Sequence, residues 1–144
     1  MEMDKIVKKN GKRSIAWGDF PPAGSTNRKP PLDLTVICWQ NGSDACKGFV
    51  ARGCDVVNAT WNPLYVVYQT RANLDKPGDG KAPPENIYRW NPLVFDSVTL
   101  DPTPRVIGAQ MCAWEEGGEI QVPALRSRLP AMSERVWNTA VVRD

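Results

Sequence analysis

The chain has 144 residues, of which 42% are hydrophobic and 24% are charged, and its formal net charge is +2. This composition is typical of one globular domain with its own core. Lysine and arginine are scattered, so no basic stripe indicates nucleic acid, and no apolar run approaches the roughly 20 residues of a membrane span.

The sequence has four cysteines without CxxC spacing and no histidine. It therefore predicts neither a zinc site nor Cys–His or Ser–His catalysis, and no cofactor is expected. Cys38 and Cys112 lie inside apolar runs, and we interpret both as buried free thiols. The first residues contain no apolar stretch of the signal-peptide kind, and the compartment is not predicted.

Four apolar segments read as strands, at residues 14–17, 35–39, 55–59 and 106–113. They are apolar throughout rather than alternating, which predicts a parallel sheet buried on both faces. Helical patterns fall between and around these segments, so the fold class is α/β with long loops. The helices are expected at 4–10, 44–52 and 121–136, the loops at 20–31 and 76–84, and a short helical turn or irregular structure at 86–96.

The last helix carries an apolar face in its sequence. Leu125, Leu129, Met132 and Val136 recur at helical spacing, so the helix is predicted to be amphipathic.

Aromatic residues stand at the ends of the predicted strands. Trp17, Trp39 and Trp114 each close one, and Tyr65 follows the third by a short turn. Because the carboxyl ends of parallel strands meet at one edge, these rings are expected to line a common site. Indole planes stack on the C–H faces of sugars, and a carboxylate such as Glu116 accepts hydrogen bonds from hydroxyls. The alternative is that each tryptophan only packs, as buried tryptophans commonly do.

Five segments resemble one family. Residues 106–116 (VIGAQMCAWEE) and 131–137 (AMSERVW) are similar to the eighth strand and closing helix of glycoside hydrolase family 20, the β-N-acetylhexosaminidases. The fifth, sixth and seventh strands of that family resemble residues 14–20 (SIAWGDF), 35–42 (TVICWQNG) and 56–67 (VVNATWNPLYVV). The segments follow in the family's order over nearly the whole chain.

The resemblance implies a (β/α)8 barrel, of which residues 1–144 would form the C-terminal half, strands five to eight and the closing helix. The helix-like start suggests a truncated or split gene product. A half-barrel has two unpaired edges, so we expect the isolated chain to be marginally stable, to dimerise through those edges, or to need the missing half in trans.

The resemblance also implies hydrolysis of terminal N-acetylhexosamine residues by substrate-assisted, retaining catalysis. Trp17, Trp39 and Trp114 would then wall the sugar pocket, with Glu116 binding the outer hydroxyls. Tyr65 would orient the acetamido oxygen, which attacks the anomeric carbon. The partner would be a glycan with N-acetylglucosamine or N-acetylgalactosamine, and relatives are often secreted, periplasmic or lysosomal.

The chain departs from the family at key positions. It contains no Asp-Glu dipeptide, which is the family's catalytic pair, and neither Asp19 nor Glu116 is a substitute for it. Val67 stands where many members have Asp or Asn, and Trp90 is interpreted as a structural anchor. Whether this chain alone is an enzyme therefore stays open, and a non-catalytic carbohydrate-binding or interaction module is the alternative. A third possibility is an α/β protein whose tryptophans only pack.

Overall fold

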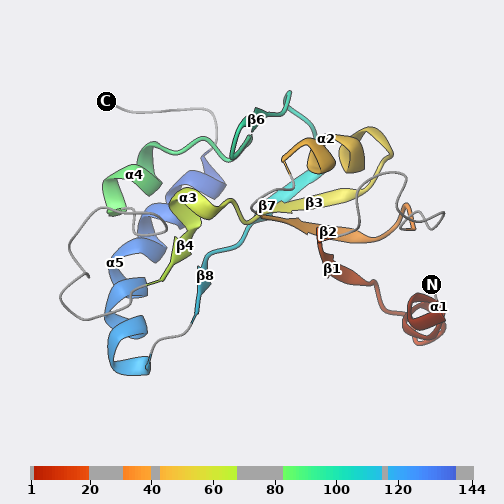
Figure 1. Ribbon diagram of the computed structural model, residues 1–144, viewed down its shortest axis with the longest axis horizontal. Coiled ribbons are helices and arrows are strands. Elements are labelled where there is room, and N and C mark those ends of the chain that lie inside the picture. The colour runs from red at the N-terminus through yellow and green to blue at the C-terminus, as the bar shows by residue number, and fades with distance from the viewer. Residues whose placement is uncertain (1, 20–30, 40–42, 68–82, 115–116, 139–144) are drawn as a thin grey trace.

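The computed structural model describes residues 2–19, 31–39, 43–67, 83–114 and 117–138. A long C-terminal helix lies at one end of the molecule, and the N-terminal helix lies beyond the sheet at the other (Figure 1). The elements follow in the order α1 (Glu2–Lys9), β1 (Ile15–Trp17), β2 (Thr35–Cys38), α2 (Ser43–Ala51), β3 (Asp55–Asn58), α3 (Trp61–Leu64), β4 (Tyr65–Val66), α4 (Pro84–Arg89), β5 (Val94–Phe95), β6 (Val98–Thr99), β7 (Val106–Ala109), β8 (Cys112–Ala113) and α5 (Gly118–Trp137).

Four of these strands form the predicted parallel sheet, in the order β1-β2-β3-β7. The predicted strands at 14–17, 35–39 and 55–59 are confirmed to within a residue at each end. Between β2 and β3 the chain crosses over through α2, which ends before Gly53. That glycine has a φ of 87°, a left-handed conformation that glycine adopts without strain. The expectation of an α/β fold with a parallel sheet is thus confirmed.

The prediction of one continuous strand over 106–113 was wrong, because the segment forms two strands. β7 pairs with β3, and β8 pairs in parallel with β4 in a separate two-stranded sheet. After β3 the chain leaves the sheet through α3 before it forms β4. The predicted strand at 106–113 is also interrupted, between Ala109 and Cys112, at the point where its pairing partner changes from β3 to β4.

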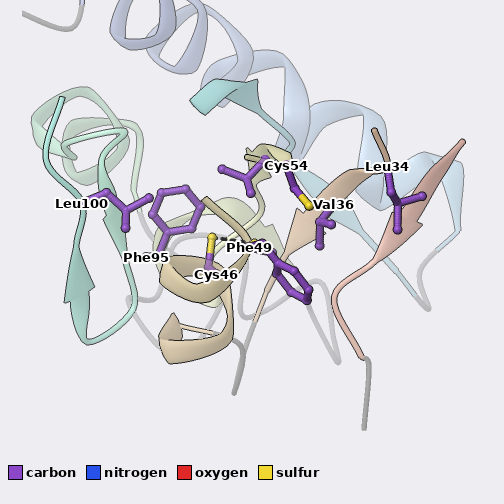
Figure 2. Close-up of a cluster of buried hydrophobic side chains, with 9 residues drawn as sticks. Leu34, Val36, Cys46, Phe49, Cys54, Phe95 and Leu100 are labelled. Atoms are coloured by element: carbon purple, nitrogen blue, oxygen red, sulfur yellow. Dashed lines mark hydrogen bonds between the residues drawn. The ribbon is translucent and has the colours of Figure 1, made fainter. Parts of the chain in front are cut away.

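The two faces of β2 belong to two different hydrophobic clusters. Val36 and Cys38 pack with Cys46 and Phe49 of α2 in the larger cluster, which also contains Phe95 (Figure 2). Ile37, between them, points to the other side and packs in a second cluster around Tyr65 and Cys112. A central strand buried on both faces is what an unbroken apolar run predicts.

The outer strands are less covered. Ile15 of β1 is 63% exposed and Ile107 of β7 is 52% exposed, although both are large apolar residues. Burial on both faces is therefore closest to complete in β2, whereas β3 buries Val56 and Asn58 on one face and the edges of the sheet are less covered.

Helix α5 buries only part of the predicted apolar face, where Leu125 packs against Val66 and Ala124, and its most buried residues lie on a neighbouring face. Leu129 is 48% exposed, whereas Ala124, Arg128 and Arg135 are buried. Successive residues turn by about 100° around a helix, so positions 124, 128 and 135 share a face that lies roughly a quarter turn from Leu129 and its apolar neighbours. Arginine is tolerated at this face because its hydrogen bonds are made: Arg135 Nε donates to the Trp90 carbonyl over 2.9 Å.

The segment at 86–96 begins within α4, which agrees with the helical one of the two alternatives predicted, and runs into the antiparallel β5–β6 hairpin. Trp90 follows α4 and is buried, with its backbone carbonyl held by Arg135. It does not line the cavity described below, which agrees with its interpretation as an anchor. None of the helices in the described ranges is both long and apolar enough to cross a membrane.

Candidate functional site

An aromatic cavity lies at the carboxyl ends of the strands. Its volume is about 370 Å³, and it is lined by Trp17, Asp19, Trp39, Trp61, Tyr65, Val67 and Trp114. A cavity of this size with mostly apolar walls and a few polar groups is typical of a small-molecule site.

Each predicted ring reaches the cavity from a different strand. Trp17 closes β1, and Trp39 directly follows β2, the neighbouring parallel strand. Tyr65 begins β4 and pairs in register with Cys112 of β8, so Trp114, two residues further along the chain, also points to this end. The structure therefore brings together Trp17, Trp39, Tyr65 and Trp114, as the sequence predicts.

Gly18 allows the chain to turn into the cavity after Trp17. Its backbone N–H donates to the carbonyl of Ile37 over 2.8 Å, which holds this segment against β2. A β-carbon added at Gly18 would lie 3.2 Å from that carbonyl oxygen and 3.5 Å from Val36. A side chain at this position would require the Ile37 carbonyl to shift by a few tenths of an ångström, next to Trp17.

The rings contact one another in a continuous row. Trp39 stacks on Tyr65 with centroids 5.9 Å apart and planes 21° apart, and Trp61 lies 4.6 Å from the same tyrosine on centroids. Trp17 meets Trp39 edge-on and Trp114 at a tilt, both at 6.4 Å. Contacts of this kind stabilise aromatic pairs beyond the area they bury, so each ring limits the orientation of the next.

Exposure rises from the floor of the cavity to its rim. Tyr65 is 4% exposed and Trp114 is 49% exposed. A ligand would therefore meet Trp114 first and reach Tyr65 last.

The Tyr65 hydroxyl stays protonated. Burial raises the pKa of Tyr65 well above its ordinary value. The neighbouring Cys112 raises this pKa further, through the negative charge of its thiolate form and through a side-chain hydrogen bond. Burial also raises the pKa of Cys112. At neutral pH both groups are neutral, so the phenol carries a proton that it can donate.

Asp19 supplies a carboxylate to the cavity wall. It accepts a hydrogen bond of 2.5 Å from Trp39 Nε1, and this fixes the edge of the ring that stacks on Tyr65. A charge-assisted hydrogen bond is stronger than a neutral one. The carboxylate thus determines the orientation of one wall.

A buried amide supports the cavity from below. Asn58, the last residue of β3, donates from Nδ2 to the carbonyls of Pro92 and Val94 over 2.9 and 2.8 Å. Its Oδ1 accepts from the backbone N–H of Thr60 over 2.9 Å. These bonds fix the chain between β3 and α3, the helix that begins with Trp61.

Three residues that line the cavity were not among the predicted site residues. Trp61 lies in α3 rather than at a strand end, and Asp19 and Val67 each lie two residues beyond a predicted ring. An available signal was the alternation of side chains along extended chain, which returns position i+2 to the side of position i. Glu116, the fifth predicted site residue, lies outside the described residues. Within the described ranges no group of three or more His, Cys, Asp or Glu side chains could hold a metal ion.

A comparison with models of protein families identifies the family of the chain. The family model described as "Glycosyl hydrolase family 20, catalytic domain" matches residues 1–140. No curated protein matches the chain.

Two solved structures share the fold. The crystal structure of Dispersin B is similar with a TM-score of 0.68 and 16% identity, over 94% of this chain and 46% of that one. The β-N-acetylhexosaminidase from Bacteroides fragilis NCTC 9343 is similar with a TM-score of 0.67 and 20% identity, over 99% of this chain and 30% of that one. The chain thus spans less than half the length of either protein and has the fold of part of a (β/α)8 barrel.

Proposed function

The chain belongs to glycosyl hydrolase family 20, and from this premise we propose that it supplies the sugar-binding part of a β-N-acetylhexosaminidase active site. One observation carries the proposal: Trp17, Trp39, Tyr65 and Trp114, from four different strands, converge on one cavity. A packing role alone would not need an open cavity of about 370 Å³ between them.

The cavity suits one N-acetylhexosamine residue. The ring of such a sugar has apolar C–H faces, which stack on indole planes, and it carries an acetamido group with one strong acceptor. The tryptophans offer the planes, and the protonated Tyr65 at the floor offers the donor. An acetamido group directed at the floor would place the rest of the sugar against Trp114 at the rim.

In the proposed reaction the acetamido oxygen of the substrate attacks its own anomeric carbon. The glycosidic C–O bond breaks, the leaving oxygen takes a proton from an acid, and an oxazolinium intermediate forms that water later opens. Tyr65 donates to the attacking oxygen and so fixes its direction of approach. We propose that the acid and its partner are not supplied by this chain, because its sequence contains no Asp-Glu dipeptide.

Val67 bears on the choice of sugar. It lines the cavity with an isopropyl group, which cannot hydrogen-bond a hydroxyl. Sites reject an analogue strongly when a buried polar group would be left unpaired. We therefore propose that the site discriminates little between N-acetylglucosamine and N-acetylgalactosamine at the hydroxyl that Val67 faces.

The absent dipeptide also favours a second candidate function, a carbohydrate-binding or interaction module without catalysis. Both functions use the same aromatic cavity and predict the same binding. They differ only in whether the chain takes part in turnover once the rest of a barrel is present.

The test is a titration of tryptophan fluorescence with N-acetylglucosamine, with glucose as the control that lacks the acetamido group. A saturable change with N-acetylglucosamine that is much weaker with glucose is expected, and no response to either sugar would overturn the proposal. A chromogenic N-acetylglucosaminide then tests the missing acid. Turnover by this chain alone would contradict its proposed absence.

We further propose that the edge strands β1 and β7 are covered in the working protein by the rest of the barrel or by a second copy. The support is their position at the two ends of the sheet and their half-exposed residues Ile15 and Ile107. An open edge readily pairs with another strand. A purified chain that is monomeric by light scattering and melts sharply at high temperature would contradict this.

A further inference from the structure

Two buried thiols meet behind the aromatic cavity. Cys38 closes β2, and Cys46 lies in α2, on the side of the sheet away from Tyr65. Their sulfur atoms are 2.6 Å apart, well inside the van der Waals contact of two sulfurs. Figure 2 shows Cys46 within the hydrophobic cluster, beside Phe49.

Apolar side chains enclose both thiols of this pair. Both side chains belong to the same buried cluster of apolar residues, so neither thiol exchanges its contact for water. The other two cysteines differ: Cys54 contacts the carbonyl of Pro31, and Cys112 contacts Gln110. The four thiols are therefore not equivalent, although all are free and buried in the structure.

We propose that Cys38 and Cys46 form a disulfide under oxidising conditions. This bond would tie β2 to α2 next to Trp39. The oxidant is a small-molecule disulfide such as oxidised glutathione. One protein thiolate attacks a sulfur of the oxidant, a mixed disulfide forms and one reduced glutathione leaves. The second protein thiol then attacks the protein sulfur of the mixed disulfide and releases the second glutathione.

This step balances. Two protein S–H bonds and one S–S bond are exchanged for one protein S–S bond and two glutathione S–H bonds, and the oxidant takes both electrons. The hydrogen bond with Cys46 and burial raise the pKa of Cys38, which keeps that thiol protonated and slow to react in the folded chain. Pairing is therefore expected during folding, or over long incubation, rather than within seconds.

The disulfide would fix the backbone next to Trp39, which forms one wall of the cavity. Trp39 is the next residue after Cys38, and its ring stacks on Tyr65. A disulfide narrows the conformations of the unfolded chain and so stabilises the folded one. The expected result is a higher melting temperature for the oxidised protein, by several degrees for a domain of this size.

Peptide mapping tests the proposal without any substitution. The protein is folded with a mixture of reduced and oxidised glutathione, quenched with acid, and alkylated while denatured. Trypsin then separates the cysteines into peptides 29–47, with Cys38 and Cys46, 53–71, with Cys54, and 106–126, with Cys112. The expected map has peptide 29–47 unlabelled and lighter by two hydrogen atoms, with the other two peptides labelled.

Labels on all the cysteines of peptide 29–47 after oxidation would overturn the proposal, as would glutathione on either of them as the final product. The variants Cys46→Ser and Cys54→Ser provide matched controls for stability. Reduction should lower the melting temperature of the wild type and of Cys54→Ser, and it should leave Cys46→Ser unchanged. An equal response of all three proteins would also contradict the cross-link.

Discussion

At the carboxyl ends of its strands the sheet carries aromatic rings in contact, whereas at the amino ends it carries ion pairs. The carboxyl end holds Trp39 against Tyr65, and beneath them the buried amide of Asn58 makes three hydrogen bonds. The Asn58 amide is neutral and enclosed, so its hydrogen bonds respond little to salt.

The amino end is built from charges in contact with solvent. Asp55, the first residue of β3, pairs with Arg13 over 2.7 Å and with Arg105 over 3.0 Å. Lys8 of α1 lies 2.7 Å from both Asp4 and Asp33. These pairs connect the chain segments that enter β1, β2, β3 and β7.

The difference matches a division common to barrels of parallel strands, in which the carboxyl ends carry the function and the amino ends carry stability. Substitutions of residues that line the cavity should therefore change sugar binding. Substitutions of the buried Asn58 and of the ion-paired Asp55 should change stability instead, by very different amounts. Four changes test this separation, from the largest expected effect to the smallest.

The largest effect is expected for Asn58→Ala. The change removes one acceptor and two donor contacts in a buried position, and it leaves the carbonyls of Pro92 and Val94 and the N–H of Thr60 without that partner. A loss of about 3 kcal/mol in the free energy of unfolding is expected, because unsatisfied buried polar groups cost the most. Urea denaturation measures it.

The exposed Asn86 of α4 is the control for that change. Asn86→Ala should alter stability by less than about 0.5 kcal/mol, as surface substitutions do. If Asn58→Ala were as mild as Asn86→Ala, the buried amide would not support the carboxyl end, and the comparison of the two ends would fail there.

Tyr65→Phe comes next. It keeps the ring that stacks on Trp39 and removes only the hydroxyl, so roughly 10-fold weaker binding of N-acetylglucosamine is expected, the equivalent of one lost hydrogen bond. Calorimetric titration measures the affinity. The affinity for glucose, which lacks the acetamido group, should not change.

Tyr88→Phe provides the matched control, because Tyr88 lies in α4 and does not line the cavity. A loss of affinity equal for both sugars in Tyr65→Phe would show that the hydroxyl shapes the cavity and does not contact the acetamido group.

Much of this site could be predicted from strand ends alone. Trp17, Trp39 and Trp114 each stand at the end of an apolar run, and the carboxyl ends of parallel strands meet at one edge of a sheet. The local sequence pattern and this one rule are enough to predict that the three rings lie together. The same reasoning predicted the central strand β2, whose two faces pack in different hydrophobic clusters. The roles of these residues toward a sugar stay predictions.

The misses share a physical cause, since each depends on a contact between distant segments. Trp61 reaches the cavity because α3 turns back toward Tyr65. The predicted strand at 106–113 is interrupted because it pairs first with β3 and then with β4. The buried face of α5 includes Arg135 because the carbonyl of Trp90, 45 positions away, accepts its hydrogen bond. Hydropathy along the chain carries no information on such partners.

Asp19 should show a smaller effect, as a positioning residue. Asp19→Leu removes the acceptor of the Trp39 N–H and should weaken N-acetylglucosamine binding about 3- to 5-fold, less than 1 kcal/mol. Asp19→Asn keeps an oxygen acceptor and should restore most of the affinity. The near-ultraviolet circular dichroism of the indoles reports the orientation directly, and identical spectra and affinities for Leu and Asn would exclude the positioning role.

The smallest effect is expected at the amino end, for Asp55→Asn. The ion pairs with Arg13 and Arg105 involve exposed guanidinium groups, so the stability lost at low salt should be below about 1 kcal/mol and should fade in 1 M salt. Asp101→Asn, outside these pairs, is the control. Sugar affinity should be unchanged in both variants, since neither residue lines the cavity.

The contribution of Asp55 to the stability of the fold should depend on pH in a defined direction. Hydrogen bonds from Arg13, then from Arg105, hold the pKa of Asp55 below its ordinary value of 3.8. A carboxyl group with a lowered folded-state pKa stabilises the fold above its unfolded-state pKa, and this contribution is lost as the pH falls toward the folded-state pKa. The wild type should therefore lose its advantage over Asp55→Asn only below about pH 4. An advantage that instead disappears between pH 5 and 8 would assign the stability of this end to another group.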